Sequence, residues 1–237
     1  VLFSTPGELN LYLTKSRGCS SVYLPNKSFL CQFPDSERFA VEKILQIHAV
    51  TLDDLYRDRS IADIDFIKID VQGAELDILK GGRKLVDDKV IGVELEVEFA
   101  QMYVDQPLFR DVDRHMAECG FQLQDLRRNY WKLKGASQIG ALKGQLIFGD
   151  ALYFRSVEGI VALCGRSSRD QAIEKIESCL LMSVAYGYLD YAMQLLVNQQ
   201  IVEILGESAV SEWTDCLKKF DRSLRFWKAG RGHVAFV

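Results

Sequence analysis

Hydrophobic residues along the chain change their spacing near residue 155, from short apolar runs to stripes at steps of three and four. Short alternating or continuous apolar runs predict strands, and the wider spacing predicts amphipathic helices. The predicted strands cover residues 9–13, 41–50, 66–71, 90–99, 121–126 and 146–154. The predicted helices cover residues 51–56, 74–86, 108–119, 169–186, 189–199 and 211–227. We therefore expect an α/β domain at residues 1–155 and a helical appendage at residues 156–237.

The order of strand, helix and strand across residues 66–99 indicates how the sheet is built. Both strands are rich in apolar residues, as is typical of strands that are buried in a parallel sheet. A helix between two such strands predicts a right-handed crossover. Thr51 and Gly120 stand where a helix start and a helix end favour these residue types.

The stretch Asp65-Phe-Ile-Lys-Ile-Asp-Val-Gln-Gly-Ala-Glu75 is the first candidate site, because an apolar strand ends there in an acid and a glycine turn. In open α/β sheets, ligands bind outside the carboxyl ends of the strands. Asp70, Gln72 and Glu75 are therefore candidates for contact with a ligand. An ordinary connection in which Asp70 caps the next helix would produce the same pattern.

The strand that follows carries Glu94, Glu96 and Glu98 on one face and apolar residues on the other. If the two strands are neighbours, Lys68 is placed to pair with one of these acids, as burial of a charge requires. A solvated edge strand is the alternative. An acidic cluster of this kind is suited to binding the amine of a cofactor, to deprotonating a hydroxyl or to holding a metal, and the sequence does not choose among these roles.

Composition narrows the class of protein. With 48% hydrophobic residues, 26% charged residues and 4 prolines in 237 residues, the chain has the composition of a globular domain. A formal net charge of -4 gives no indication of nucleic-acid binding. The 6 cysteines form no C-x-x-C pair and have no histidine at metal-ligand spacing, so we expect reduced thiols and no metal site. No secretory leader is visible, which makes a cytoplasmic location the default expectation.

The longest apolar stretch, residues 179–197, is a weak candidate for a membrane span. Asp190 and Gln194 interrupt it, and its apolar residues recur at helical spacing. We therefore expect an amphipathic helix and no transmembrane segment.

Several motifs together resemble the FkbM family of S-adenosylmethionine-dependent methyltransferases. The resemblance covers roughly residues 1–155 and follows the order of the family. It rests on Gly18-Cys-Ser-Ser21, Thr51-Leu-Asp-Asp-Leu55, Ile64 to Glu75, Leu79-Lys-Gly81, Gly92 to Phe99, Gln106-Pro-Leu-Phe109 and Lys143 to Tyr153.

The resemblance implies part of a class I, Rossmann-like methyltransferase sheet, mostly parallel, with the Asp70 strand as the fourth and the glutamate strand as the fifth. It implies S-adenosylmethionine as cofactor and O-methylation of a hydroxyl on a glycan, lipid or secondary metabolite. The cofactor-binding residues would be Asp70, Val71, Gln72, Gly73 and Glu75. The catalytic residues would be Asp70, supported by Glu94 and Glu96.

One departure from the family pattern changes these expectations. No G-x-G-x-x-G loop occurs in the chain, and Gly230-Arg-Gly232 follows helices rather than a strand. With Val1 as first residue, we expect an N-terminally truncated domain that is incomplete for catalysis. The alternative is a non-catalytic, methyltransferase-like module that binds a partner, or a second copy, through residues 156–237. The basic residues near the C-terminus, from Lys218 to Arg231, are most simply a solvated face.

Overall fold

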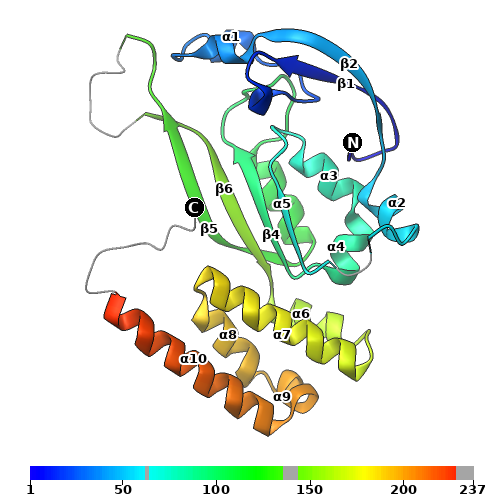
Figure 1. The fold of residues 1–237 in the computed structure, drawn as a ribbon, viewed down its shortest axis with the longest axis vertical. Coiled ribbons are helices and arrows are strands. Elements are labelled where there is room, and N and C mark those ends of the chain that lie inside the picture. Colours follow the sequence, from blue (N-terminus) through cyan, green and yellow to red (C-terminus); the bar gives the residue numbers. More distant parts are fainter. Residues whose placement is uncertain (62–63, 136–143, 228–237) are drawn as a thin grey trace. The chain divides into compact units, whose positions relative to one another are not determined.

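The computed structural model describes residues 1–61, 64–135 and 144–227, with residues 222–227 as backbone alone (Figure 1). The chain divides into two compact units, the first made of Val1–Arg155 and the second beginning at Ser156. The first unit contains both β-sheets, and the second consists of helices in its described part. Each unit is described below by itself.

The larger sheet of the first unit has the strand order β3-β4-β6-β5. These strands are β3 (Phe66–Ile69), β4 (Gly92–Glu98), β6 (Gln145–Arg155) and β5 (Phe121–Trp131). β3 and β4 are parallel, as the strand-helix-strand order predicts. β6 is antiparallel to both β4 and β5.

The expectation of a mostly parallel sheet is therefore wrong, because two of the three strand pairs in the described sheet are antiparallel. A parallel pair needs a crossover connection, whereas an antiparallel pair can be formed by consecutive strands. β6 folds back directly on β5, with Trp131 opposite Gln145, and its other edge pairs with β4. The apolar patterns of β5 and β6 do not indicate whether these strands run parallel or antiparallel to their neighbours.

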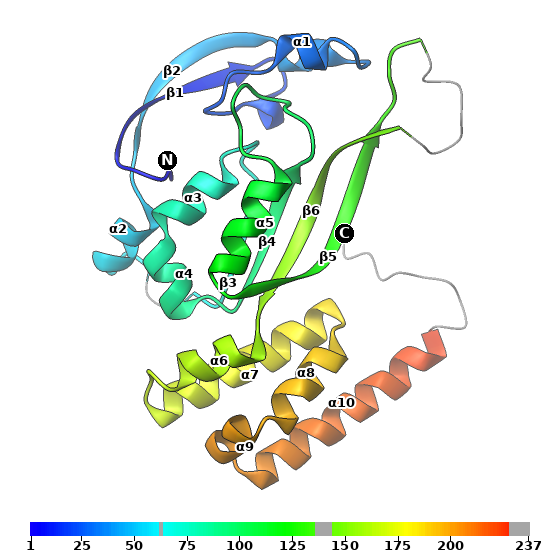
Figure 2. The same cartoon turned by 180° about the vertical axis from the view of Figure 1, so that it is seen from behind.

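Three helices cover one face of this sheet, as Figures 1 and 2 show from opposite sides. They are α3 (Glu75–Gly81), α4 (Arg83–Lys89) and α5 (Phe109–Glu118). The alternating residues Val93, Leu95 and Val97 of β4 are fully buried in the core that includes Leu79 and Met116. The glutamates of β4 consequently lie on the opposite face.

The predicted helix at residues 74–86 is divided into α3 and α4 at Gly82. A Cβ at Gly82 would lie 2.8 Å from the side chain of Leu52, and one at Gly81 would lie 2.1 Å from the backbone oxygen of Phe3. Other parts of the chain therefore pack directly against this glycine pair. The contact with Leu52 comes from α2 (Leu52–Arg57), which begins at a Thr51 capping box as its sequence predicts.

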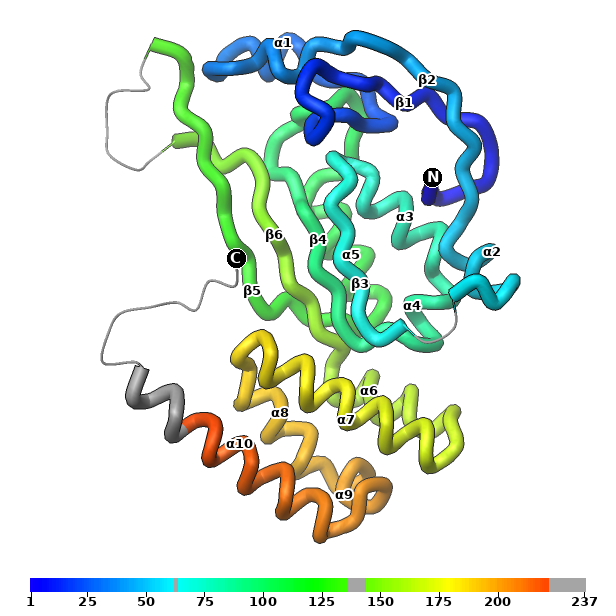
Figure 3. Tube along the Cα trace, viewed as in Figure 1, coloured from blue at the N-terminus to red at the C-terminus, as the bar shows by residue number. Residues whose placement is uncertain are grey.

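The N-terminal segment forms a separate two-stranded antiparallel sheet, which the tube in Figure 3 follows from β1 to β2 and on to α2. Its strands are β1 (Gly7–Thr14) and β2 (Val41–Ala49), with η1 (Arg17–Cys19), α1 (Lys27–Leu30) and η2 (Ser36–Phe39) between them. Phe33 and Phe39 pack with Tyr103 and Trp131 in one aromatic cluster. This cluster brings the N-terminal segment to the chain that follows β4.

The second unit contains five helices in its described part: α6 (Val157–Cys164), α7 (Arg169–Tyr186), α8 (Leu189–Val197), α9 (Gln199–Leu205) and α10 (Glu207–Trp227). Ser168 forms a capping box at the start of α7, and Gly187 ends that helix with a φ of 83°. None of the described helices has the length and apolar character that a membrane span requires. The Gly230-Arg-Gly232 sequence and the basic residues Lys228 and Arg231 lie outside the described residues.

Candidate functional site

The turn between β3 and α3 contains two successive residues in the left-handed region. Gln72 has a φ of 63° and Gly73 a φ of 101°. Glycine adopts this conformation readily, whereas glutamine does so at a cost of about 1 kcal/mol. A Cβ at Gly73 would also lie 3.2 Å from Nε2 of Gln106. The turn therefore has a conformational need for glycine at position 73, and a side chain there would also press against Gln106.

Glu75 holds this turn from inside. Its side chain is buried, and its Oε1 accepts a hydrogen bond of 2.8 Å from the backbone N–H of Val71. Its Oε2 accepts one of 2.9 Å from the N–H of Gly73. Burial raises the pKa of Glu75 to about 7, against the lowering effect of these hydrogen bonds, and the charge of Asp70 raises it further. Both oxygens are thus engaged in shaping the turn.

Gln72 connects the acids of the two parallel strands. Its Nε2 donates to Oδ1 of Asp70 at 3.2 Å and to Oε1 of Glu96 at 3.0 Å. Asp70 itself is exposed just beyond the end of β3. The structure thus brings Asp70, Gln72 and Glu96 together.

Glu94 has a different partner. Lys68 lies beside it in the parallel register, and the Lys68 Nζ donates to Oε1 of Glu94 at 2.9 Å. Nη2 of Arg127 on β5 lies 3.6 Å from the same oxygen and 3.4 Å from Oδ2 of Asp150. The hydrogen bond to Glu94 is the main cause of the raised pKa of Lys68. The pairing of Lys68 with a glutamate of the next strand is as the sequence predicts.

Glu96 and Glu98 lie further along the same face. Burial raises the pKa of Glu96 to about 8, and the charges of Asp70, Glu75 and Asp150 act in the same direction. Glu98 is 2% exposed, and burial together with Glu75 and Glu96 raises its pKa well above the ordinary value. The nearby Gln106 amide partly offsets that rise, but Oε1 of Glu98 and Nε2 of Gln106 lack hydrogen-bond partners among the described residues. The end of β4 therefore favours carboxyl groups that keep their protons.

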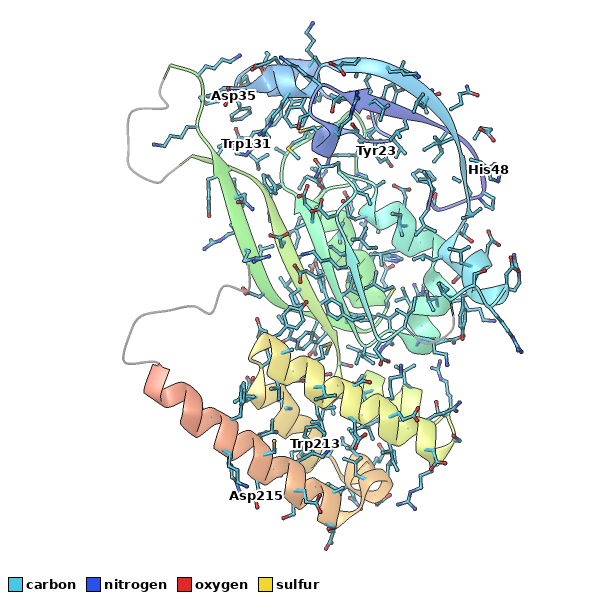
Figure 4. The ribbon with its side chains drawn as sticks, viewed as in Figure 1. Tyr23, Asp35, His48, Trp131, Trp213 and Asp215 are labelled. Carbon is cyan, nitrogen blue, oxygen red and sulfur yellow. The ribbon has the colours of Figure 1, made fainter. Side chains whose placement is uncertain are left out.

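Residues far away in the sequence complete the site. Ser21 Oγ donates to the backbone oxygen of Gln72 at 2.7 Å, and the Tyr103 hydroxyl lies 3.1 Å from Oε1 of Gln72. Tyr23, labelled in Figure 4, donates to Oδ2 of Asp77 on α3 at 2.6 Å. The similarity of Gly18-Cys-Ser-Ser21 to a family loop was a sequence signal for Ser21, whereas no spacing pattern pointed to Tyr103.

The predicted site residues thus fall into distinct environments. Val71 is 37% exposed at the turn, beside the exposed Asp70. Glu94 is linked to Lys68 rather than to Gln72. Within the described ranges, no group of three or more histidine, cysteine, aspartate or glutamate side chains has the arrangement of a metal site.

Comparisons with known proteins identify the family to which the chain belongs. The model of the Methyltransferase FkbM domain matches residues 5–123, which is half of the chain. The matched region includes β3, β4 and the turn that carries Asp70, Gln72 and Glu75. Searches among curated proteins and among solved structures gave no match. The chain belongs to the FkbM methyltransferase domain family.

Proposed function

We propose that the first unit takes part in the transfer of a methyl group from S-adenosylmethionine to a hydroxyl group, at the carboxyl ends of β3 and β4. Membership of the FkbM family supports methyl transfer as the general reaction. The observation that carries the location is the Gln72 amide, which joins Asp70 at the end of one strand to Glu96 on the next. This is the edge of an α/β sheet at which ligands are bound.

The charge of the site suits this cofactor. When bound, S-adenosylmethionine supplies a methyl group on a positively charged sulfonium, and it also carries an ammonium group. A carboxylate at the exposed position of Asp70 attracts such a cation. We propose that Asp70, Val71 and Gly73 contact the cofactor, and that Gln72 lies beside them in the same turn with its amide on Asp70. Glu75 contributes by holding the N–H groups of Val71 and Gly73 in the turn.

The carboxyl groups also have a role in the proton balance of the reaction. As the new O–C bond forms and the C–S bond breaks, the hydroxyl of the acceptor loses its proton. We propose Asp70 as the group that receives this proton, because it is exposed at the strand end. Glu96, with a pKa of about 8, keeps its own proton at neutral pH and so does not repel a negative charge on Asp70. Glu94 supports the arrangement through Lys68.

The proposed acceptor is a hydroxyl on a glycan, a lipid or a secondary metabolite, the class that the family resemblance implies. Methyl transfer mainly requires that the acceptor oxygen be held close to the methyl carbon and in line with the C–S bond. The partly exposed turn around Gln72 has the access that such an acceptor needs.

A second candidate function is a non-catalytic module that binds a partner. The observation in its favour is the absence of a G-x-G-x-x-G sequence from the 237 residues. The helical unit would then provide the contact surface, on which Leu181 is 59% and Val197 73% exposed. Cofactor binding separates the two functions.

The test is calorimetric titration of the full chain with S-adenosylmethionine. We expect saturable binding, and we expect Asp70→Asn to weaken it about tenfold, the effect of losing ~1.4 kcal/mol of attraction. Asp58→Asn makes the same chemical change at an exposed position after α2 and serves as the matched control. Release of S-adenosylhomocysteine then identifies acceptors among hydroxyl compounds. No binding by the native chain, or equal weakening by both variants, would contradict the proposal.

A further inference from the structure

Gln72 occupies an unusual place in the site, because a neutral side chain stands between two acids and in a backbone conformation that glutamine rarely adopts. We propose that Gln72 is a positioning residue, whose amide holds Asp70 and Glu96 in one arrangement, rather than a group that binds the cofactor directly. The catalytic meaning of this inference rests on the methyl transfer proposed above. Its structural content can be tested without any substrate.

The orientation of the amide follows from its neighbours. A primary amide has two N–H donors, and Nε2 of Gln72 uses them toward Asp70 and Glu96. At the other end, Oε1 lies 3.1 Å from the hydroxyl of Tyr103. Rotation of the amide by half a turn would place its oxygen against the Asp70 carboxylate, which has no proton to donate. The Tyr103 hydroxyl has a single proton and also donates to the backbone oxygen of Cys19 at 2.9 Å, so Asp70 is the neighbour that favours the observed orientation.

The backbone of Gln72 is held as firmly as its side chain. Its φ of 63° lies in the left-handed region, which costs a non-glycine residue about 1 kcal/mol. Ser21 offsets this cost by donating to the backbone oxygen of Gln72, and the same hydroxyl accepts a bond of 3.0 Å from the N–H of Tyr23. Ser21 is itself buried. The N-terminal segment thus fixes Gln72 from its backbone side.

These contacts leave the amide with little capacity for a ligand. Both of its donors and one of its acceptor positions already have protein partners, so a ligand would have to displace one of them. Gln72 acts instead on the groups that it joins. The acids Asp70, Glu75 and Asp150 face Glu96 and disfavour its charged form, whereas the Gln72 amide favours it. The hydrogen bond from the Gln72 amide therefore opposes the rise in the pKa of Glu96 that the neighbouring acids cause.

The experiment measures the titration of Glu96 by ¹³C NMR of carboxyl-labelled glutamate in the full chain. The Glu96 resonance is identified by its loss in Glu96→Gln. Gln72→Met keeps the length of the side chain and removes both N–H donors. We expect it to raise the titration midpoint of Glu96 by about 1 pH unit, the effect of losing a hydrogen bond to a charged group.

Two further variants test whether the shift comes from the Gln72 amide. Gln72→Asn tolerates the left-handed backbone and stays polar, but its amide is one methylene too short for the same contacts, so it should shift the midpoint in the same direction. Ser21→Ala loosens the backbone and leaves the amide in place; we expect a clearly smaller shift. An unchanged midpoint in both Gln72 variants, or an equal shift in Ser21→Ala, would overturn the inference. A shifted midpoint in a chain that does not bind S-adenosylmethionine would contradict only the proposed function.

Discussion

The buried glutamates of β4 predict that the first unit loses stability as the pH rises. Burial raises the pKa of Glu96 from an ordinary value of 4.5 to about 8. Between these two values the folded chain binds more protons than the unfolded chain, so the free energy of unfolding falls with increasing pH. The stabilising contribution is complete below the unfolded pKa and is lost as the pH passes through the folded pKa.

The size of the effect follows from the pKa difference. One group that is protonated in the folded state and ionised in the unfolded state changes stability by ~1.4 kcal/mol per pH unit. From about pH 5 to about pH 8, Glu96 alone then accounts for roughly 3–4 kcal/mol. Glu75, with a pKa raised to about 7, and the buried Glu98 act in the same direction. We expect Glu96→Gln to remove the contribution of Glu96, about one proton, from the fall in the free energy of unfolding with pH. The glutamine oxygen still provides an acceptor for the Gln72 amide.

The assay is urea denaturation at a series of pH values. Trp131 is the tryptophan of residues 1–155, so Trp213→Phe and Trp227→Phe leave it as the fluorescent reporter of the first unit. Trp131 packs against Phe33 with ring centroids 5.5 Å apart and should respond to unfolding. Glu37→Gln, at an exposed position, is the control. A stability that does not change with pH, or a full decline in Glu96→Gln, would refute the reasoning.

Three other predictions concern single contacts and use the same denaturation assay. Arg155→Leu should destabilise the first unit by about 3 kcal/mol, because the buried guanidinium donates to the carbonyls of Val86, Val90 and Cys119. The Val86 carbonyl would keep the backbone N–H of Val90, whereas the other two would lose this donor; a loss below ~1 kcal/mol would show that water or relaxation satisfies them. Thr51→Ala should cost about 1 kcal/mol by removing the capping box of α2, and Thr51→Ser should restore most of it. Gly82→Ala should cost about 1–3 kcal/mol because its Cβ would lie 2.8 Å from both Cβ and Cδ1 of Leu52. Leu52→Ala removes Cδ1 but keeps Cβ, so it should reduce only part of that added cost in the double variant.

Much of the local structure could be predicted because it depends on residues close together in the chain. The capping box at Thr51, the helix end at Gly120 and the separation of apolar and acidic residues onto opposite faces of β4 all appear where their residue types indicate. The break at Gly82 was missed, since it goes with the packing of Leu52 against Gly82 and of Phe3 against Gly81, which the helical pattern does not contain. Strand direction was missed for a similar reason, because β6 has the same apolar content whichever way it runs.

For the candidate site, the sequence by itself determined which acids stand at the end of β3 and along β4, because strand periodicity and the glycine turn are local. It also determined the family, because the motifs and their order can be recognised without a structure. Only the tertiary structure decided that the Gln72 amide joins Asp70 to Glu96. It also decided that Lys68 pairs with Glu94, and that Ser21 and Tyr103 form hydrogen bonds with Gln72. The physical reason is that hydrogen bonds between distant segments depend on strand pairing and register, which side-chain spacing along one strand does not encode.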